Sequence, residues 1–218
     1  MKYEGILFDL DGTLVDTKAG LISAFTHTFA QFGLLIPQEQ MQSYMGPPLR
    51  QTFAQYVKES EVETAVMTYR TFYANHGLKE VQLFEGVKEM LIQLHQQGVP
   101  MGVATSKEQS VAKKILEHFE LDSFFCVIEG ASQDTSKDNK TAVMKAALSH
   151  FSCDTKKVLM IGDREHDLIG AKNCGLDAVS VLYGYGTMEE YQEFSPVYIA
   201  KNVQELTEWL LKACCSQE

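Results

Sequence analysis

The sequence has too few basic residues for a protein that binds nucleic acid or a membrane surface. Lys and Arg number 19 against 29 Asp and Glu, which gives a formal net charge of −10 at pH 7. Phosphate backbones and anionic lipids both attract a basic face, so we expect neither nucleic acid nor membrane among the partners. The sequence also lacks an apolar run near the roughly 20 residues that a membrane-spanning helix needs.

Cysteines are few, and their spacing does not suit a disulfide framework or a zinc site. The five are odd in number, and no two have the C-x-x-C spacing. A reducing compartment fits such a pattern. Acids at Glu4, Asp9 and Asp11 fall where an export signal would carry its apolar stretch, so we expect no signal peptide and a cytoplasmic protein.

What the sequence does have is the composition of a globular protein with a large core. The chain has 218 residues, of which 45% are hydrophobic and 22% are charged. Short apolar runs alternate with amphipathic stretches of helical spacing, as in parallel sheets covered on both faces. The runs are Ile6 to Phe8, Val99 to Ala104, Phe124 to Ile128, Val158 to Ile161 and Ala178 to Leu182. This alternation predicts an α/β fold with a doubly wound parallel sheet.

One long interval interrupts the alternation. No convincing strand occurs between Asp16 and about Gln82, and apolar residues there have helical spacing. We expect an inserted helical domain at 16–82, and an α/β core domain made of 1–15 and 83–218. The alternative is a set of extra helices packed on the sheet itself.

Two acids directly follow the first apolar run. Asp9 and Asp11 are two residues apart, and Gly12 after them permits a tight turn. In open α/β sheets, ligands bind beyond the carboxyl ends of the strands, which is where this pair falls. An Asp-Gly turn without chemistry is the alternative interpretation.

Later strand ends carry further polar groups. Thr105 and Ser106 follow the second apolar run, and Asp163 follows a later one. Asp167 is four residues beyond Asp163, so a helical turn would place both carboxylates on one face. Acids that converge without a counter-charge repel one another, and a hard cation relieves this repulsion. Oxygen ligands of this kind favour Mg²⁺.

A lysine near the start of a helical pattern is the candidate for a phosphate-binding cation. Lys140 opens the pattern that continues through Val143. A positive charge in the first turn of a helix is unfavourable with the helix dipole, unless the lysine and the helix N-terminus bind the same anion. Asp138 or Asn139 would cap this helix. Lys137 competes for the same role, and a solvated loop lysine is the alternative for either residue.

Together these segments resemble the four motifs of the haloacid dehalogenase superfamily, in its phosphoglycolate phosphatase-like branch. The matching segments are Asp9 to Asp16, Ala104 to Lys107, Lys140, and Gly162 to Asp167, in that order. Features of the 5′-nucleotidase-like subgroup also occur. They are Met45 to Leu49, Leu182 to Gly186, and Ser132 to Lys140, the last of which favours Lys140 over Lys137.

This resemblance implies a phosphatase that acts on a small phosphorylated metabolite. Asp9 is then the nucleophile that forms an aspartyl-phosphate, and Asp11 is the general acid and base. Mg²⁺ is held by Asp9, the Asp11 backbone carbonyl and Asp163, and Asp167 either binds the metal directly or orients a water bound to it. Substrate phosphoryl oxygens are contacted by Thr105, Ser106 and Lys140.

The resemblance also implies that the inserted helices form a cap domain. Arg50, after the segment Met45 to Leu49, is the candidate there for binding an anionic group of the substrate. Tyr183 and Tyr185, between glycines, are expected to be exposed. Two other activities stay open, a phosphosugar mutase of the same superfamily and a phospho-accepting signalling domain. The protein is expected to be a monomer or a homodimer.

Overall fold

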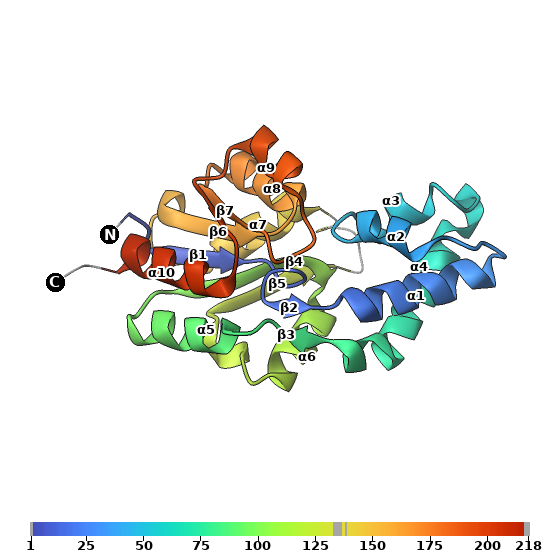
Figure 1. Cartoon of the computed structure of the whole chain (residues 1–218), viewed down its shortest axis with the longest axis horizontal. Coiled ribbons are helices and arrows are strands. Elements are labelled where there is room, and N and C mark those ends of the chain that lie inside the picture. The colour runs from blue at the N-terminus through green and yellow to red at the C-terminus, as the bar shows by residue number, and fades with distance from the viewer. Residues whose placement is uncertain (1, 133–136, 138, 216–218) are drawn as a thin grey trace. The chain divides into compact units, whose positions relative to one another are not determined.

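The larger of the two sheets in the structure is six-stranded and parallel (Figure 1). The structure is a computed structural model that describes residues 2–132, 137 and 139–215. The strand order is β5-β4-β1-β6-β7-β8, so the first strand of the chain lies in the middle. This arrangement confirms the predicted α/β fold with a doubly wound parallel sheet.

Five of the six strands lie at the predicted apolar runs, with shifted ends. The strands are β1 (Gly5–Phe8), β4 (Met101–Glu108), β5 (Val127–Ala131), β6 (Val158–Gly162), β7 (Ala178–Val181) and β8 (Tyr198–Ala200). Val99 precedes β4 rather than belonging to it. Strand β8 was not predicted, because it has only three residues, of which two are partly exposed, and gives no clear apolar run.

Helices cover both faces of this sheet. They are α5 (Val87–Gln96), α6 (Gln109–His118), α7 (Lys140–Leu148), α8 (Glu165–Cys174), α9 (Met188–Phe194) and α10 (Val203–Cys214), with short 3₁₀ turns η4 (Asp122–Phe124) and η5 (Thr155–Lys157). In Figure 1, α7 and α8 lie on one face, and α5 and α6 on the other. Because both faces are covered, every residue of β1 and β6 is buried.

The chain divides into two compact units. One consists of 1–15 and 83–218 and contains the large sheet, and the other consists of 16–82. The second unit contains α1 (Lys18–Gln31), α2 (Gln38–Met41), α3 (Leu49–Phe53), α4 (Val62–Asn75), and the 3₁₀ turns η1 (Gln42–Tyr44), η2 (Glu59–Glu61) and η3 (Gly77–Glu80). The segments β2 (Val15–Asp16) and β3 (Gln82–Leu83) pair where the chain passes from one unit to the other.

Aromatic side chains form the core of the helical unit. Phe25 of α1 lies within 6 Å of the rings of Tyr44, Phe53 and Tyr69, measured between centroids. Phe25 and Phe53 are fully buried. Such tilted and edge-to-face pairs stabilise by about 0.5–1.5 kcal/mol each beyond the burial of their area. The helical spacing of these residues therefore reflects a packed core within 16–82.

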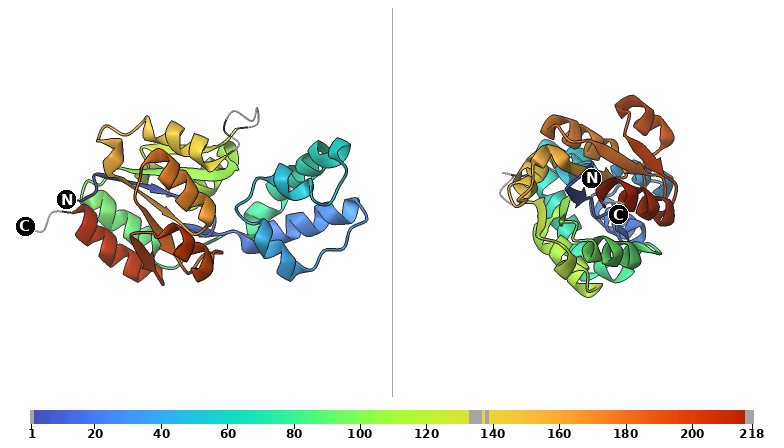
Figure 2. Two further views of the ribbon diagram at one scale, coloured as in Figure 1. Left: turned by 90° about the horizontal axis from the view of Figure 1, so that it is seen from above. Right: turned by 90° about the vertical axis from the view of Figure 1, so that its left-hand side faces the viewer.

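The beginning of the chain is held against its last helix. The backbone N–H of Lys2 donates to the carbonyl of Ala213 in α10 (3.0 Å), and Figure 2 shows the two segments side by side. Within the described parts of the chain, none of the helices is long and apolar enough to cross a membrane.

Candidate active site

The central strands bring the predicted acids to one edge of the sheet. β1 pairs with β4 on one side and with β6 on the other, all in parallel. Asp9 follows β1, Thr105 lies in the second half of β4, and Asp163 follows β6. Because parallel strands present their carboxyl ends at the same edge, these three residues lie at one edge of the sheet although more than 90 positions separate the first two.

A tight turn after β1 places Asp9 and Asp11. Gly12 has a φ of +81°, a conformation that glycine adopts without strain. A Cβ at Gly12 would lie 2.1 Å from Oδ2 of Asp163, so the backbone also approaches the neighbouring acid too closely for a side chain. The turn therefore needs glycine both for its conformation and for its packing.

Lys140 lies between two buried carboxylates. Its Nζ is 2.6 Å from Oδ1 of Asp9 and 2.6 Å from Oδ1 of Asp167. Burial opposes the charge on Lys140, but the carboxylates of Asp167 and Asp9 outweigh it and raise the pKa of the ammonium above its ordinary value. Lys140 is therefore positively charged at neutral pH.

The helix that carries Lys140 begins as the sequence suggested. Asn139 is the N-cap of α7, and its side-chain oxygen accepts a hydrogen bond from the N–H of Ala142 (3.0 Å). Asp138, the other cap candidate, lies outside the described residues, as do residues 133–136 of the motif that begins at Ser132.

Lys137 does not join this cluster. Its Nζ forms an ion pair with Glu129 and donates to Oε1 of Gln109 (3.2 Å). Of the two candidate lysines, the structure brings only Lys140 to Asp9 and Asp167. The three-residue separation places the two side chains in different surroundings, since Lys137 precedes the helix and Lys140 is its first residue.

Asp163 and Asp167 meet in a different way from the one predicted. Asp163 precedes α8 rather than lying on it, so the two do not share a helix face. Instead, Oδ2 of Asp167 accepts the backbone N–H groups of Asp163 (3.2 Å) and Arg164 (3.1 Å). The expected one-face arrangement is wrong, and an acid in the first turn that accepts free N–H groups explains the contact.

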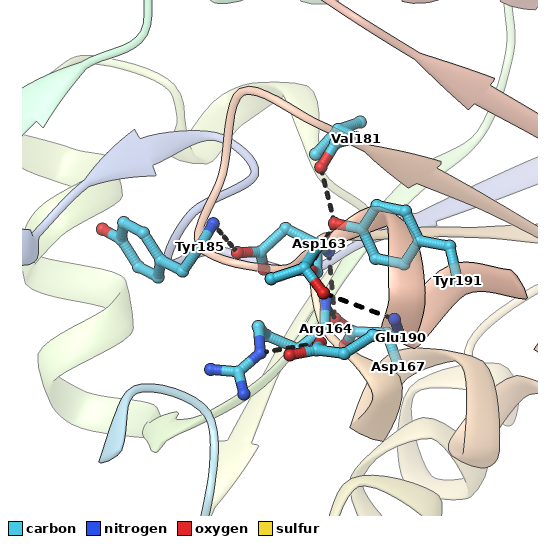
Figure 3. A network of polar contacts seen from close by, with 8 residues as sticks. Asp163, Arg164, Asp167, Val181, Tyr185, Glu190 and Tyr191 are labelled. Atoms are coloured by element: carbon cyan, nitrogen blue, oxygen red, sulfur yellow. Dashed lines mark hydrogen bonds and ion pairs between the residues drawn. The ribbon is translucent and has the colours of Figure 1, made fainter. Parts of the chain in front are cut away.

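Backbone groups and a phenol surround Asp163 (Figure 3). Its Oδ2 accepts the N–H of Tyr185 (2.7 Å), and its carbonyl accepts the hydroxyl of Tyr191 (2.6 Å). Burial, followed by the charges of Asp167 and Asp9, raises the pKa of the Asp163 carboxyl well above its usual range. Among the described residues its Oδ1 is buried with no hydrogen-bond partner.

The acids fit a divalent cation. Asp9, Asp163 and Asp167 are all buried, and each offers an oxygen that lies within 4.8 Å of the others. Three carboxylates and one lysine leave an excess of negative charge in the cluster. Burial raises the pKa of Asp9 to about 7, although the positive charge of Lys140 acts to lower it. A cation among them would remove this penalty and would satisfy Oδ1 of Asp163.

Four further residues were predicted for the site, and each has different neighbours. Thr105 is buried, and its hydroxyl accepts the N–H of Lys107 (3.2 Å), whereas Ser106 is exposed. The Asp11 carboxylate forms an ion pair with Lys107 (3.1 Å). In the helical unit, Arg50 donates to Oε2 of Glu63 (3.0 Å), so its guanidinium already pairs with a carboxylate.

The sequence interpretation missed several residues at this edge. Tyr183 and Tyr185 are partly buried rather than exposed, and the hydroxyl of Tyr183 donates to the carbonyl of Thr13 (3.1 Å). The glycines around them were the available signal, since a Cβ at Gly184 would lie 2.3 Å from the carbonyl of Gly12. Tyr191 gave no signal, because nothing in the sequence connects it with Asp163.

Comparisons with known proteins agree with this geometry. Residues 6–181 match the family described as "Haloacid dehalogenase-like hydrolase". The tyrosine-protein kinase PtkA of Mycobacterium tuberculosis is 36% identical over 208 residues, which cover 94% of this chain and 72% of that protein. A 5′-nucleotidase of Pseudomonas aeruginosa is 34% identical over 213 residues, which cover 96% of each chain.

A solved structure is similarly close. The crystal structure of "a predicted phosphatase" from Clostridium acetobutylicum matches with a TM-score of 0.91 and 33% identity, over 96% of this chain and 99% of that one. Sequence, fold and site thus agree with the resemblance inferred from the four motifs. This chain belongs to the haloacid dehalogenase-like hydrolase family and is a phosphatase of that family.

Proposed function

We propose that the protein is a Mg²⁺-dependent phosphate-monoester hydrolase that works through an aspartyl-phosphate on Asp9. The observation that carries this proposal is the buried cluster of Asp9, Lys140, Asp163 and Asp167 at the carboxyl ends of β1 and β6. Its substrate is a small phosphorylated metabolite, and we assign the enzyme to the cytoplasm.

In the first step, an oxygen of Asp9 attacks phosphorus, and the bond from phosphorus to the ester oxygen breaks. Asp11 gives its proton to that leaving oxygen, which departs as an alcohol. An alkoxide leaves poorly without a proton, so a second acid two residues from the nucleophile supports this assignment. The product on the enzyme is a mixed anhydride of Asp9 and phosphate.

In the second step, water attacks the phosphorus of the aspartyl-phosphate. Asp11, now ionised, takes the proton of the water, and the bond between phosphorus and the Asp9 oxygen breaks. Inorganic phosphate leaves, and both acids return to their starting protonation states. One difficult displacement is thereby divided into two easier ones.

Lys140 and Thr105 serve the transferring phosphoryl group in this proposal. Lys140 is charged and buried between Asp9 and Asp167, within reach of any phosphorus that Asp9 attacks. Thr105 offers a buried hydroxyl on the neighbouring strand, and Ser106 adds a second polar group. Fixed donors of this kind stabilise the charge that develops on the phosphoryl oxygens.

The cation would be held by the carboxylates of Asp9, Asp163 and Asp167, with the Asp11 backbone carbonyl as a further ligand. When bound, Mg²⁺ supplies positive charge for the phosphoryl oxygens and relieves the repulsion among the acids. The choice of Mg²⁺ rests on the all-oxygen donor set.

The helical unit 16–82 acts as a cap domain in this proposal. A cap excludes water from the reaction and provides contacts for the substrate. Arg50 is the candidate for an anionic substrate group, although it would have to exchange its contact with Glu63. The substrate classes we favour are phosphoglycolate-like acids and nucleoside 5′-monophosphates, the latter supported by the 5′-nucleotidase of P. aeruginosa.

Phosphate release from a panel of monoesters tests the proposal. The panel contains phosphoglycolate, nucleoside 5′-monophosphates and hexose phosphates, each with Mg²⁺ and with a chelator. We expect Mg²⁺-dependent release of inorganic phosphate. An isomerised sugar phosphate without release would identify a mutase, and a stable phosphorylated Asp9 without turnover would identify a signalling domain.

The similarity to a tyrosine kinase supports one further assay. PtkA is 36% identical to this chain over 208 residues, which cover 94% of this chain. Incubation with ATP and a tyrosine-containing protein distinguishes transfer to tyrosine from transfer to water. Phosphotyrosine without release of inorganic phosphate would overturn the assignment of water as the acceptor.

A further inference from the structure

Helix α9 contacts the residue that follows β6 through a buried phenol. Tyr191 is fully buried, and its hydroxyl lies 2.6 Å from the carbonyl of Asp163 and 2.8 Å from the carbonyl of Val181 (Figure 3). The single hydroxyl proton is thus shared between two carbonyls at neighbouring strand ends. Burial and the charge of Asp163 raise the pKa of this phenol above its ordinary value, so it remains a donor at neutral pH.

The phenol lies where the pairing of β6 with β7 ends. The last paired residues of these two strands are Gly162 and Ser180, and the next residues along the chain are Asp163 and Val181. Val181 still pairs with Ala200 of β8, whereas Asp163 lies beyond the end of β6. The Tyr191 hydroxyl contacts the carbonyls of both residues, so it ties the Asp163 backbone to the end of β7.

The segment between β7 and α9 also fixes one carboxylate oxygen of Asp163. Oδ2 accepts the N–H of Tyr185, and a Cβ at Gly184 would lie 2.6 Å from this oxygen. A Cβ at Gly186 would lie 1.9 Å from the Asp163 carbonyl and 2.5 Å from the Tyr191 hydroxyl. The backbone of residues 184–186 therefore limits the Asp163 carboxylate to a narrow range of positions.

The other oxygen is left for the cluster of acids. Oδ1 of Asp163 is buried and has no hydrogen-bond partner among the described residues, and Asp163 offers an oxygen within 4.8 Å of those of Asp9 and Asp167. A second contact joins the segment after β6 to α9, since Arg164 donates from Nε to Oε2 of Glu190 (3.1 Å).

We propose that Tyr191 is a positioning residue for the metal site, which holds the Asp163 backbone so that Oδ1 faces Asp9 and Asp167. The inference rests on the proposed function, because it assumes that these acids bind a divalent cation. Groups that orient a metal ligand typically change metal affinity by about 10- to 100-fold when they are removed. Tyr191 touches neither substrate nor cation and acts through Asp163.

Tyr191→Phe tests the inference, because it removes the hydroxyl and keeps the ring that packs in the core. Mg²⁺ alone is titrated into the full chain by calorimetry, and the rise in melting temperature with Mg²⁺ is measured in parallel. We expect the dissociation constant for Mg²⁺ to rise by about 10- to 100-fold. Turnover of a monoester should recover to near the wild-type rate once Mg²⁺ is saturating.

Tyr3→Phe is the matched control. Tyr3 is also buried in the sheet-containing unit, and its hydroxyl donates to Oδ2 of Asp177 (2.7 Å), so the control also removes one phenol hydrogen bond. It should lower the melting temperature without changing the affinity for Mg²⁺. Equal Mg²⁺ affinity in Tyr191→Phe and wild type, with only a lower melting temperature, would overturn the inference and leave Tyr191 a structural residue.

The titration also separates this inference from the proposed function. Asp163→Asn removes a charged ligand and should abolish Mg²⁺ binding. If the wild type itself binds no Mg²⁺, then the proposed cofactor and the positioning role both fail. If the wild type binds Mg²⁺ and Tyr191→Phe binds it equally well, only the positioning role fails.

Discussion

The two sides of the acid cluster are held in different ways. On the ionic side, Asp9 after β1 and Asp167 in α8 share the ammonium of Lys140, with both distances at 2.6 Å. On the hydrogen-bonded side, Asp163 after β6 is held by a backbone N–H and a phenol and has no lysine or arginine ion pair in the described structure. Ion pairs can exchange partners when a ligand enters, whereas the backbone contacts of Asp163 belong to the fold.

This difference matches the two roles in the proposed reaction. Asp9 must form and break a bond, and Lys140 must turn from a carboxylate to a phosphoryl group, so both need contacts that can change. Asp163 needs only to stay in place as a ligand. We infer that the ionic side of the cluster is the reacting side and that the hydrogen-bonded side is the support.

The largest effect is expected from breaking the ionic side at Asp9. Asp9→Asn keeps the shape of the side chain but removes the nucleophile, so turnover should fall by roughly 10⁴-fold or more. Phosphate release measures turnover, and circular dichroism confirms that the variant is folded. Near-normal turnover in Asp9→Asn would contradict the assignment of the nucleophile.

Removing the lysine should cost both stability and activity. Lys140→Met leaves two buried carboxylates without their cation, which typically costs about 3–5 kcal/mol of unfolding free energy. Added Mg²⁺ should restore part of this loss, as seen in urea unfolding with Mg²⁺ and with a chelator. Lys137→Met is the matched control and should cost less stability than Lys140→Met, because Lys137 and Glu129 are only partly buried and lie outside the acid cluster.

A methyl group at Gly184 would disturb the hydrogen-bonded side. Its Cβ would lie 2.3 Å from the carbonyl of Gly12 and 2.4 Å from Cβ of Asp163, so Gly184→Ala must displace backbone. We expect about a 10- to 100-fold weaker affinity for Mg²⁺ by calorimetry. Gly98→Ala should cost about 1–2 kcal/mol of stability at its φ of +69° and leave this affinity unchanged. Equal affinities in both variants would show that the close approach at Gly184 is unimportant.

The smallest effect is expected at an exposed ion pair outside the acid cluster. Tyr3 donates to Asp177 and Lys2 pairs with it, and these contacts lower the pKa of the Asp177 carboxyl. The stabilisation is present above the unfolded pKa of about 3.9 and is lost as pH falls through the lower folded pKa. Asp177→Asn should therefore destabilise by at most about 1 kcal/mol at pH 7, and by less at pH 3. A larger difference at pH 3 in urea unfolding would contradict this sign.

Much of the fold could be predicted from the sequence, because buried strands carry continuous apolar runs. The acids at the ends of β1 and β6 were identified for the same reason, since each directly follows such a run. Strand β8 was missed because an edge strand of three residues, two of them partly exposed, has no comparable run. The preference for Lys140 over Lys137 rested on the resemblance of Ser132 to Lys140, because sequence spacing leaves the start of α7 uncertain by a few residues.

The supports of Asp163 could not be predicted from the sequence. The Tyr185 contact uses a backbone N–H, which every residue except proline has, so no side-chain pattern marks it. Tyr191 is 28 residues from Asp163 and sits in a helix whose sequence, Met188 to Phe194, is rich in acids. Contacts of this kind depend on the tertiary structure and have no local signature.

Trapping the covalent intermediate tests the central claim most directly. The wild type is mixed with a monoester that it hydrolyses and Mg²⁺, quenched in acid during turnover, digested, and examined by mass spectrometry. We expect one phosphoryl group on the peptide that contains Asp9, removable by hydroxylamine and missing in Asp9→Asn. A phosphoryl group on another residue, or full turnover by Asp9→Asn, would contradict the account.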